Sequence, residues 1–212
     1  MRRHVAGCLL AAHLLAAPAA ALADGCPFLL GPGLHTVVVH SGGAERPMAV
    51  LVPLGAREGK PLALVFDLHG SGSNGEQQAL SSGLRDLADR EDFVVAHPDG
   101  AVTAPGHPEQ HFWNIPGVPL IGGAAVPPGT ADDVQFISDA IDAVAAATCV
   151  DARRVYVTGM SGGARMTSLL ACRLAQRIAA VAPVAGLRAG PPGTGADAAP
   201  APEGCQPSRP VP

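Results

Sequence analysis

A serine framed by glycines, in the motif GMSGG at residues 159–163, is the part of this 212-residue sequence best suited to chemistry. The spacing fits G-x-S-x-G, in which a serine hydroxyl is exposed on a sharp turn between a strand and a helix. The glycines leave room for that turn, and the N-terminus of the helix favours developing negative charge. Residues 155–158 (VYVT) read as a strand and a helical run follows at once, which supports a nucleophile at Ser161.

Acyl transfer at a serine also needs N–H groups that bind the oxyanion. One is the N–H of the residue after the nucleophile, here Gly162, and the other comes from the loop after an earlier strand. The sequence DLHGSGSNG (67–75) provides such a loop after a buried apolar strand at Leu62–Leu68. Gly70 would let the backbone turn sharply, so we expect the N–H of Ser71 to be the second donor. The loop is not expected to bind phosphate, because neither of the glycine-rich patterns G-x-x-x-x-G-K-[ST] and G-x-G-x-x-G is present.

The base that would take the proton of Ser161 is not evident in the sequence. In folds with this motif the acid and then the histidine follow the serine, but here the only later acids are Asp197 and Glu203 and no histidine follows His111. The sequence is therefore interpreted either as a piece of a longer hydrolase or as a short chain without hydrolytic activity. A third alternative is an upstream base, because a triad is defined by geometry rather than chain order. The candidates for it are His69, His97 and His111.

Residues 101–130 carry two further features. His107 and His111 lie four positions apart around Glu109, but the pattern is not H-E-x-x-H, and Pro108 argues against a helix that presents both rings. No metal site is expected there, and no cofactor is implied. Trp113 is the only tryptophan, and it either lines a substrate cleft or pins this long loop to the core.

The N-terminus has the form of a secretory signal peptide. Arg2 and Arg3 precede a short apolar run at 5–17, and ALA at 21–23 is a small-x-small cleavage pattern. This run is too short to span a membrane, and no later stretch is long enough. We expect residues 1–23 to be removed and the mature protein to be secreted, either extracellular or periplasmic.

Charge and cysteine content narrow the function classes. The chain has 18 acidic and 14 basic residues, a net charge of −4, and no basic patch, which argues against a nucleic-acid partner. Four cysteines follow the expected cleavage site, and an even number in an exported chain suggests two disulfides with three possible connectivities. These candidates are Cys26, Cys149, Cys172 and Cys205.

The segments around these motifs alternate between strand and helix. An antiparallel hairpin is predicted from residues 35–40 and 47–53, and further strands at 62–70, 93–100, 154–159 and 179–186. Helices are predicted at 75–92, 131–148 and 161–177. This order argues for an α/β fold with a mostly parallel sheet and helices on both faces. Residues 101–130 are predicted to be a long loop, and the Pro/Gly-rich residues 189–212 a loop or a disordered tail.

As an ordered set, these motifs resemble the secreted polyhydroxybutyrate depolymerase-like and feruloyl esterase group of α/β-hydrolases. Between Leu62 and Gly186 the resemblance is carried by DLHGSGSNG, HPDG, HFWN, ADDVQFISDAID, RVYVTGMSGGARMTSLLAC and AAVAPVAG. It implies an α/β-hydrolase domain over residues 24–188 that hydrolyses carboxylic esters through an acyl-enzyme on Ser161. It also implies an oxyanion hole at Ser71 and Gly162. That group often has Asn where this sequence has Gly162, and an N–H donor survives the change.

The resemblance also bears on the missing base and on the substrate. In that group a cysteine and an Arg-Pro-Val-Pro-like segment lead into another strand, whose His-Gly-Thr-x-Asp motif carries the acid, and the histidine comes later still. This sequence stops at Pro212, where that strand would begin, so the domain is expected to be incomplete, with its C-terminal strands missing. The substrate would be a small-molecule or polymer ester: a polyhydroxyalkanoate or aliphatic ester, or alternatively a feruloyl or acetyl ester on plant polysaccharide such as xylan. A function of another class is a non-catalytic exported binding module that keeps a hydrolase-like cleft.

Overall fold

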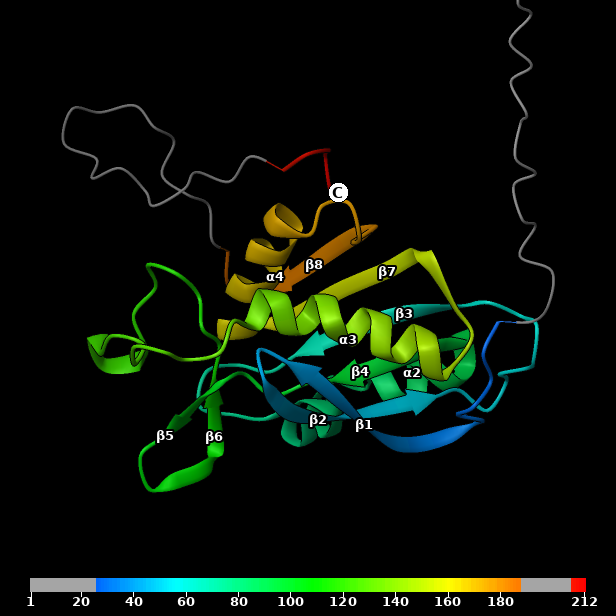
Figure 1. The fold of residues 1–212 in the computed structure, drawn as a ribbon, viewed down its shortest axis with the longest axis horizontal. Coiled ribbons are helices and arrows are strands. Elements are labelled where there is room, and N and C mark those ends of the chain that lie inside the picture. The colour runs from blue at the N-terminus through cyan, green and yellow to red at the C-terminus, as the bar shows by residue number, and fades with distance from the viewer. Residues whose placement is uncertain (1–25, 188–206) are drawn as a thin grey trace, which may run out of the picture.

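Six strands form one sheet in the computed structural model, which describes residues 26–187 and 207–212. They are β1 (Gly33–Ser41), β2 (Ala44–Val52), β3 (Leu62–Leu68), β4 (Phe93–His97), β7 (Val150–Met160) and β8 (Ala180–Val184). Their order across the sheet is β1-β2-β4-β3-β7-β8, as Figure 1 shows. β1 and β2 pair antiparallel, as do β2 and β4, and the other neighbours are parallel. The predicted α/β fold, with its N-terminal hairpin and mostly parallel sheet, is confirmed.

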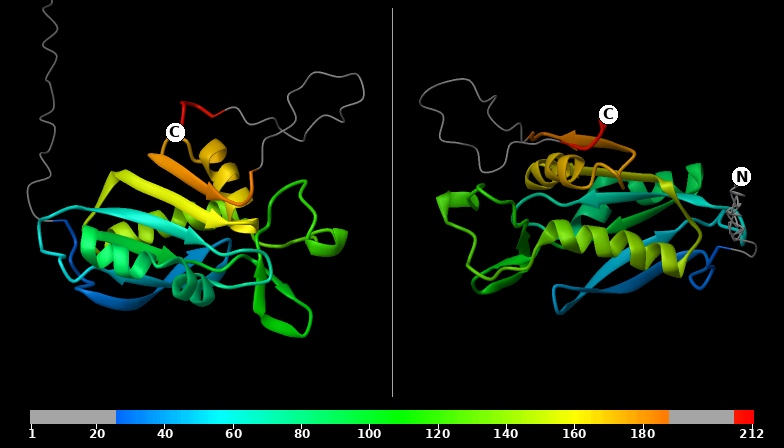
Figure 2. Two further views of the ribbon diagram at one scale, coloured as in Figure 1. Left: turned by 180° about the vertical axis from the view of Figure 1, so that it is seen from behind. Right: turned by 45° about the horizontal axis from the view of Figure 1, so that its top comes forward.

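Helices cover both faces of this sheet. α1 (Gly75–Ser82) and α2 (Leu84–Glu91) connect β3 to β4, and lie on one face. α3 (Asp133–Ala147) and α4 (Gly162–Arg173) lie together on the other face, in front of the sheet in Figure 1, and Figure 2 shows the same layers from two further sides. The opposite faces follow from right-handed crossovers, because β3 to β4 runs one way across the sheet, whereas β4 to β7 and β7 to β8 run the other way.

β3 is the central strand that positions the site. Leu62, Leu64, Phe66 and Leu68 on one face of β3 are almost completely buried, and Asp67 on the other face is buried too, as expected for a strand covered on both faces. The core around them includes Phe136, Ile137 and Ile141 from the apolar stripe of α3. Because the parallel strands β3, β4 and β7 end at the same edge, the loops after them meet there.

Two segments differ from the sequence prediction. The helix expected over residues 75–92 is two helices, because Gly83 adopts φ 70° and ends α1. The long loop expected over residues 101–130 contains a hairpin of β5 (Val102–Ala104) and β6 (His107–Phe112), and a short 3₁₀ turn, η1 (Ile121–Gly123). The turn of that hairpin contains Gly106, at φ 76°.

The two ends of the described chain are tied to the sheet. A disulfide joins Cys26 to Cys149, just before β7. Residues 207–212 lie along β8, where Val181 N–H donates to Pro212 O (2.9 Å), so this part of the predicted tail is a loop in contact with the sheet edge.

Cys172 is also in disulfide form, while Cys205 lies outside the described residues. The predicted signal peptide lies outside them too, and no helix within them is long and apolar enough to cross a membrane.

Candidate active site

Ser161 lies at the junction of β7 and α4, where the chain passes from strand to helix without a loop. Its backbone has φ 52° and ψ −107°, a combination that residues with side chains rarely adopt. Two hydrogen bonds hold it there: its N–H donates to Val184 O (2.9 Å), and its carbonyl accepts from Arg165 N–H (3.2 Å). The residue is half-buried rather than enclosed in the core. This is the geometry of a nucleophile elbow.

Glycines 159 and 163 let this turn pack directly against the end of β3. A Cβ atom on Gly163 would lie 2.7 Å from His69 O and still closer to Leu68 O. A Cβ atom on Gly159 would lie 2.8 Å from Leu68 O. Because the obstructing atoms belong to the main chain, they cannot rotate away as a side chain could. The elbow therefore requires glycine at both positions.

Gly163→Ala is expected to lower the free energy of unfolding by about 1–3 kcal/mol, the usual cost of overpacking a close-packed site. Gly31→Ala is the matched control, because nothing lies within 4 Å of its Cβ position, and it should change stability by less than about 0.5 kcal/mol. Urea denaturation followed by circular dichroism measures both variants. Equal stabilities of the two would contradict the packing of α4 against β3.

Two backbone N–H groups lie beside Ser161. The nitrogen of Ser71 is 2.9 Å from the point that a Cβ atom on Gly162 would occupy, so the loop after β3 touches the first residue of α4. Neither N–H donates a hydrogen bond to the residues that the structure describes. That of Gly162 is one of the free donors at a helix N-terminus. Together they could hold an oxyanion that forms on Ser161.

Trp113 is buried, and this favours the second of its two predicted roles, which is to anchor the loop. Only 3% of its surface is exposed. Its Nε1 donates to His69 O (2.9 Å), and its ring stacks on the His69 ring with 4.8 Å between centroids. The residues after it, between Asn114 and Val126, line a hollow of about 340 Å³ instead.

No histidine among the described residues is hydrogen-bonded to Ser161. His69 uses both ring nitrogens elsewhere, Nδ1 with Gly70 O (2.8 Å) and Nε2 with the N–H of Gly100 (3.0 Å). His111 donates from Nδ1 to Gly100 O (3.0 Å). The geometry therefore gives both rings structural contacts and does not favour either as the base.

The third candidate, His97, belongs to a buried acid–histidine pair that the sequence did not reveal. Its Nδ1 lies 3.3 Å from Asp67 Oδ2, and Gln78 donates to Asp67 Oδ1 (2.7 Å). Because Gln78 is on α1, the pair lies on the face of the sheet opposite α4. Asp67 in the apolar run LALVFDL was the available signal, since a buried charge needs a partner.

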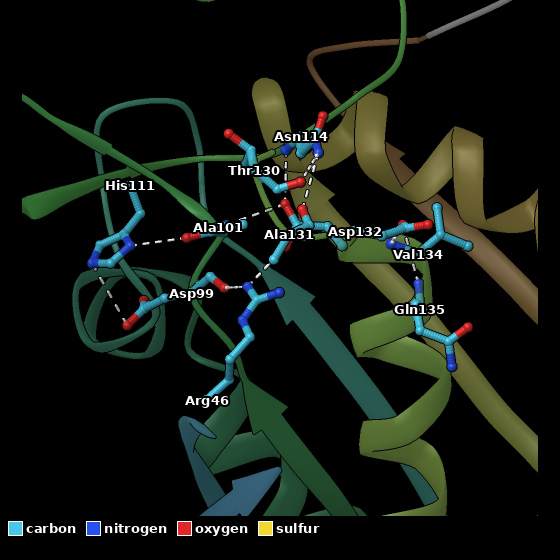
Figure 3. A network of polar contacts seen from close by, with 12 residues as sticks. Arg46, Asp99, Ala101, His111, Asn114, Thr130, Ala131, Asp132, Val134 and Gln135 are labelled. Carbon is cyan, nitrogen blue, oxygen red and sulfur yellow. Dashed lines mark hydrogen bonds and ion pairs between the residues drawn. The ribbon is translucent and has the colours of Figure 1, made fainter. Parts of the chain in front are cut away.

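A second buried ion pair, also not predicted, joins the hairpin to α3 (Figure 3). Arg46 Nη2 lies 2.7 Å from Asp133 Oδ1 and donates to Asp99 O (2.6 Å). The guanidinium also stacks over the ring of Phe136, 3.5 Å from its centroid. The pair therefore connects β2 and α3 to the chain that follows β4.

The other oxygen of Asp133 holds the loop that carries Trp113. It accepts from the N–H groups of Asn114 (2.7 Å) and Ala101 (3.2 Å). Burial raises the pKa of the Asp133 carboxyl above 3.8, while the charge of Arg46 and the two N–H donors lower it. Asp132, the residue before α3, caps this helix with its side chain, as Figure 3 shows.

The paired histidines of residues 107–111 lie on β6. His107 is exposed, and its Nδ1 is 3.3 Å from Glu109 Oε1, whereas His111 turns toward Gly100. Within residues 26–187 and 207–212 no group of three or more His, Cys, Asp or Glu side chains could hold a metal ion.

Comparison with known sequences gives related esterases. A family model described as "Esterase PHB depolymerase" matches residues 47–199. A bifunctional acetylxylan esterase/xylanase of Neocallimastix patriciarum is 31% identical over 144 residues, which cover 68% of this chain and 18% of that protein. Feruloyl esterase B of Piromyces equi is 34% identical over 145 residues, covering 66% of this chain and 24% of that protein. The chain thus spans less than a quarter of the length of either relative.

Two solved structures with a similar fold are named as esterases. Acetyl xylan esterase from Aspergillus awamori superposes with a TM-score of 0.56 at 19% identity, over 72% of this chain and 53% of that one. A ferulic acid esterase gives a TM-score of 0.54 at 15% identity, over 70% and 56%. At these identities the superpositions show the fold alone.

Proposed function

Because the chain belongs to the esterase PHB depolymerase family, we propose that it acts in the hydrolysis of carboxylic esters through an acyl-enzyme on Ser161. One observation carries this proposal beyond the family. Ser161 is held at φ 52° beside two N–H groups, those of Ser71 and Gly162, that donate to no described residue. A strained serine next to free donors is the arrangement that acyl transfer requires.

In the proposed reaction Ser161 Oγ attacks the ester carbonyl and gives its proton to a base. The carbonyl oxygen becomes an oxyanion that accepts from Ser71 and Gly162 N–H. Collapse of this intermediate breaks the bond to the alcohol, which leaves with a proton, and the acyl group stays on Ser161. Water then attacks the acyl-enzyme and releases the acid. No described residue fills the place of the base or of the acid that would orient it.

We propose two substrate classes. The name of the family model supports a polyhydroxyalkanoate or aliphatic ester. The names of the two relatives support the alternative, a feruloyl or acetyl ester on plant cell-wall polysaccharide.

We also propose that residues 1–23 direct export and that residues 24–188 form the hydrolase domain. The disulfide between Cys26 and Cys149 fits an oxidising compartment.

Acyl transfer from matched esters tests this function. The purified chain is incubated with p-nitrophenyl ferulate, p-nitrophenyl acetate or p-nitrophenyl 3-hydroxybutyrate, which share one leaving group, and its intact mass is measured after acid quenching. The expected result is an added acyl group with at least one ester, and the fastest ester identifies the substrate class. A folded chain that gains no acyl group from any of them would favour the non-catalytic binding module or an inert piece of a longer hydrolase.

A further inference from the structure

The loop that carries Ser71 is held by β6 and by its own turn. Gly72 N–H donates to His111 O and His111 N–H donates to Ser73 O, both at 2.8 Å, as an isolated antiparallel bridge. Ser73 N–H turns back to Gly70 O at 3.1 Å. Within the described residues the two N–H groups that follow Ser71 are therefore occupied, while that of Ser71 is left for a ligand.

The direction of the Ser71 N–H depends on the Gly70 oxygen, which accepts from Ser73 N–H and from one side chain, that of His69. Nδ1 of His69 lies 2.8 Å from Gly70 O and donates to it. The Gly70 oxygen and the Ser71 N–H belong to the same planar trans peptide, in which they point in opposite directions. A group that fixes the Gly70 oxygen therefore also aims the Ser71 N–H.

The hydrogen bonds of His69 also define its protonation state. Nε2 lies 3.0 Å from the nitrogen of Gly100, whose N–H can only donate, so Nε2 must accept. Nδ1 faces a carbonyl, which can only accept, so the proton is on Nδ1. A second proton on Nε2 would set two donors against each other and break the contact with Gly100.

The surroundings of the ring keep it in this position. His69 is completely buried, and Trp113 stacks on it while donating to its carbonyl at 2.9 Å. The Gly100 peptide that it contacts is held from the other side, because His111 Nδ1 donates to Gly100 O at 3.0 Å. Movement of the His69 ring would therefore disturb the Trp113 stack as well as the loop.

The titratable groups that face His69 are Asp99, from the turn after β4, and His111, from β6. Burial lowers the pKa of His69 below 6.5, and His111 acts in the same direction. The hydrogen bond with Gly70 and the Asp99 carboxylate raise that pKa but do not outweigh burial. As the pH falls below 6.5, His69 takes up a proton more readily in the unfolded chain than in the folded chain. Its contribution to the free energy of unfolding is therefore lost as the pH falls.

We infer that His69 is a positioning residue whose neutral Nδ1–H form aims the Ser71 N–H at the oxyanion, and that proton uptake by His69 releases the loop and weakens the oxyanion hole. The inference rests on the proposed function, because it gives His69 a part in the same reaction. His69 acts through Ser71 and touches no reacting atom.

Two substitutions separate positioning from simple packing. In His69→Asn the side-chain amide can still donate to Gly70 O but cannot titrate, whereas His69→Ala has no donor. The measurement is the second-order rate constant for labelling of Ser161 by a fluorophosphonate, whose phosphoryl oxygen occupies the oxyanion hole. At pH 8 we expect His69→Asn to react within about fivefold of the wild type and His69→Ala about 10²-fold more slowly, as when one oxyanion donor is lost. His40→Asn, at an exposed histidine, is the matched control.

The pH dependence gives the sharper result. The wild-type rate divided by the His69→Asn rate cancels the titration of whatever group takes the proton of Ser161. This ratio is expected to fall as the pH is lowered from 6.5 to 5, while the ratio for the His40→Asn control stays constant. A constant ratio for His69→Asn, or a folded His69→Ala variant that reacts as fast as the wild type, would overturn the inference.

A second measurement does not depend on activity. ¹⁵N spectra of histidine side chains at pH 7.5 should show His69 neutral, with its proton on Nδ1 and none on Nε2. A proton on Nε2 would overturn the inference whether or not Ser161 reacts. A folded wild type that is not labelled at Ser161, but shows the Nδ1–H form, would count against the proposed function and not against the place of His69 in the loop.

Discussion

Ser161→Ala is expected to remove covalent labelling by a fluorophosphonate completely, because it removes the oxygen that would bond to phosphorus. This expectation does not depend on which group accepts the proton. Any ester hydrolysis should fall as well, by about 10⁴-fold or more if the serine is fully activated, since a residual rate remains from substrate binding and the oxyanion hole. The measurement is the rate of labelling and of p-nitrophenyl ester hydrolysis for the two proteins.

The matched control for Ser161→Ala is Ser81→Ala, a serine on α1 whose hydroxyl only donates to Gln78 O. It should be labelled as the wild type is. Added imidazole, which can accept a proton, is expected to accelerate labelling of the wild type but not of Ser161→Ala. If Ser161→Ala keeps half or more of the wild-type labelling rate, another residue is the nucleophile.

Arg46→Met is expected to lower the free energy of unfolding by about 3–5 kcal/mol, because it leaves a buried carboxylate without its counter-charge. The side chain of Arg46 is 12% exposed and that of Asp133 is fully buried, so water cannot replace the lost partner. Met retains the apolar stem that packs near Phe136. Urea denaturation at pH 7 measures the loss. A loss of less than about 1 kcal/mol would contradict the account of this ion pair.

The control for Arg46→Met is Arg153→Met, whose side chain is 90% exposed next to Asp151. An exposed pair of this kind contributes little to the free energy of unfolding, so its loss should change stability by less than about 0.5 kcal/mol.

Burial already raises the pKa of Asp133, and loss of Arg46 should raise it further. The carboxyl is neutral at low pH and charged above its folded pKa. The free energy of unfolding that Arg46→Met loses relative to the wild type should therefore grow as the pH rises from 4 to 7.

The fold and the elbow could be predicted because their signals are local. The continuous apolar run of β3 and the helical spacing of apolar residues in α3 each predict a buried element from the local sequence. The glycines around Ser161 are dictated by contacts within one strand, one turn and one helix, and a short motif records all of them. Oxyanion donors are backbone groups, so their positions follow from the connections and not from side-chain identity.

Two of the features that the sequence did not decide depend on contacts between distant segments. Arg46 and Asp133 meet only because β2 and α3 converge, and neither segment predicts the other. Trp113 could not be assigned to cleft or core before its loop was placed against His69. The hairpin of β5 and β6 was not predicted, because the sequence of β6, HPEQHF, has no alternating apolar face and contains proline. For the ion pair and for Trp113 the deciding contact lies between segments distant in the sequence, whereas the hairpin is a local feature.

The central claim is that Ser161 is the nucleophile, and mapping a fluorophosphonate adduct on the unmodified chain tests it most directly. Trypsin cleaves after Arg154 and Arg165, which releases VYVTGMSGGAR with Ser161 as its only serine. The predicted result is a single adduct on this peptide, placed on Ser161 by tandem mass spectrometry. An adduct on another peptide, such as the one that carries Ser71, would contradict it.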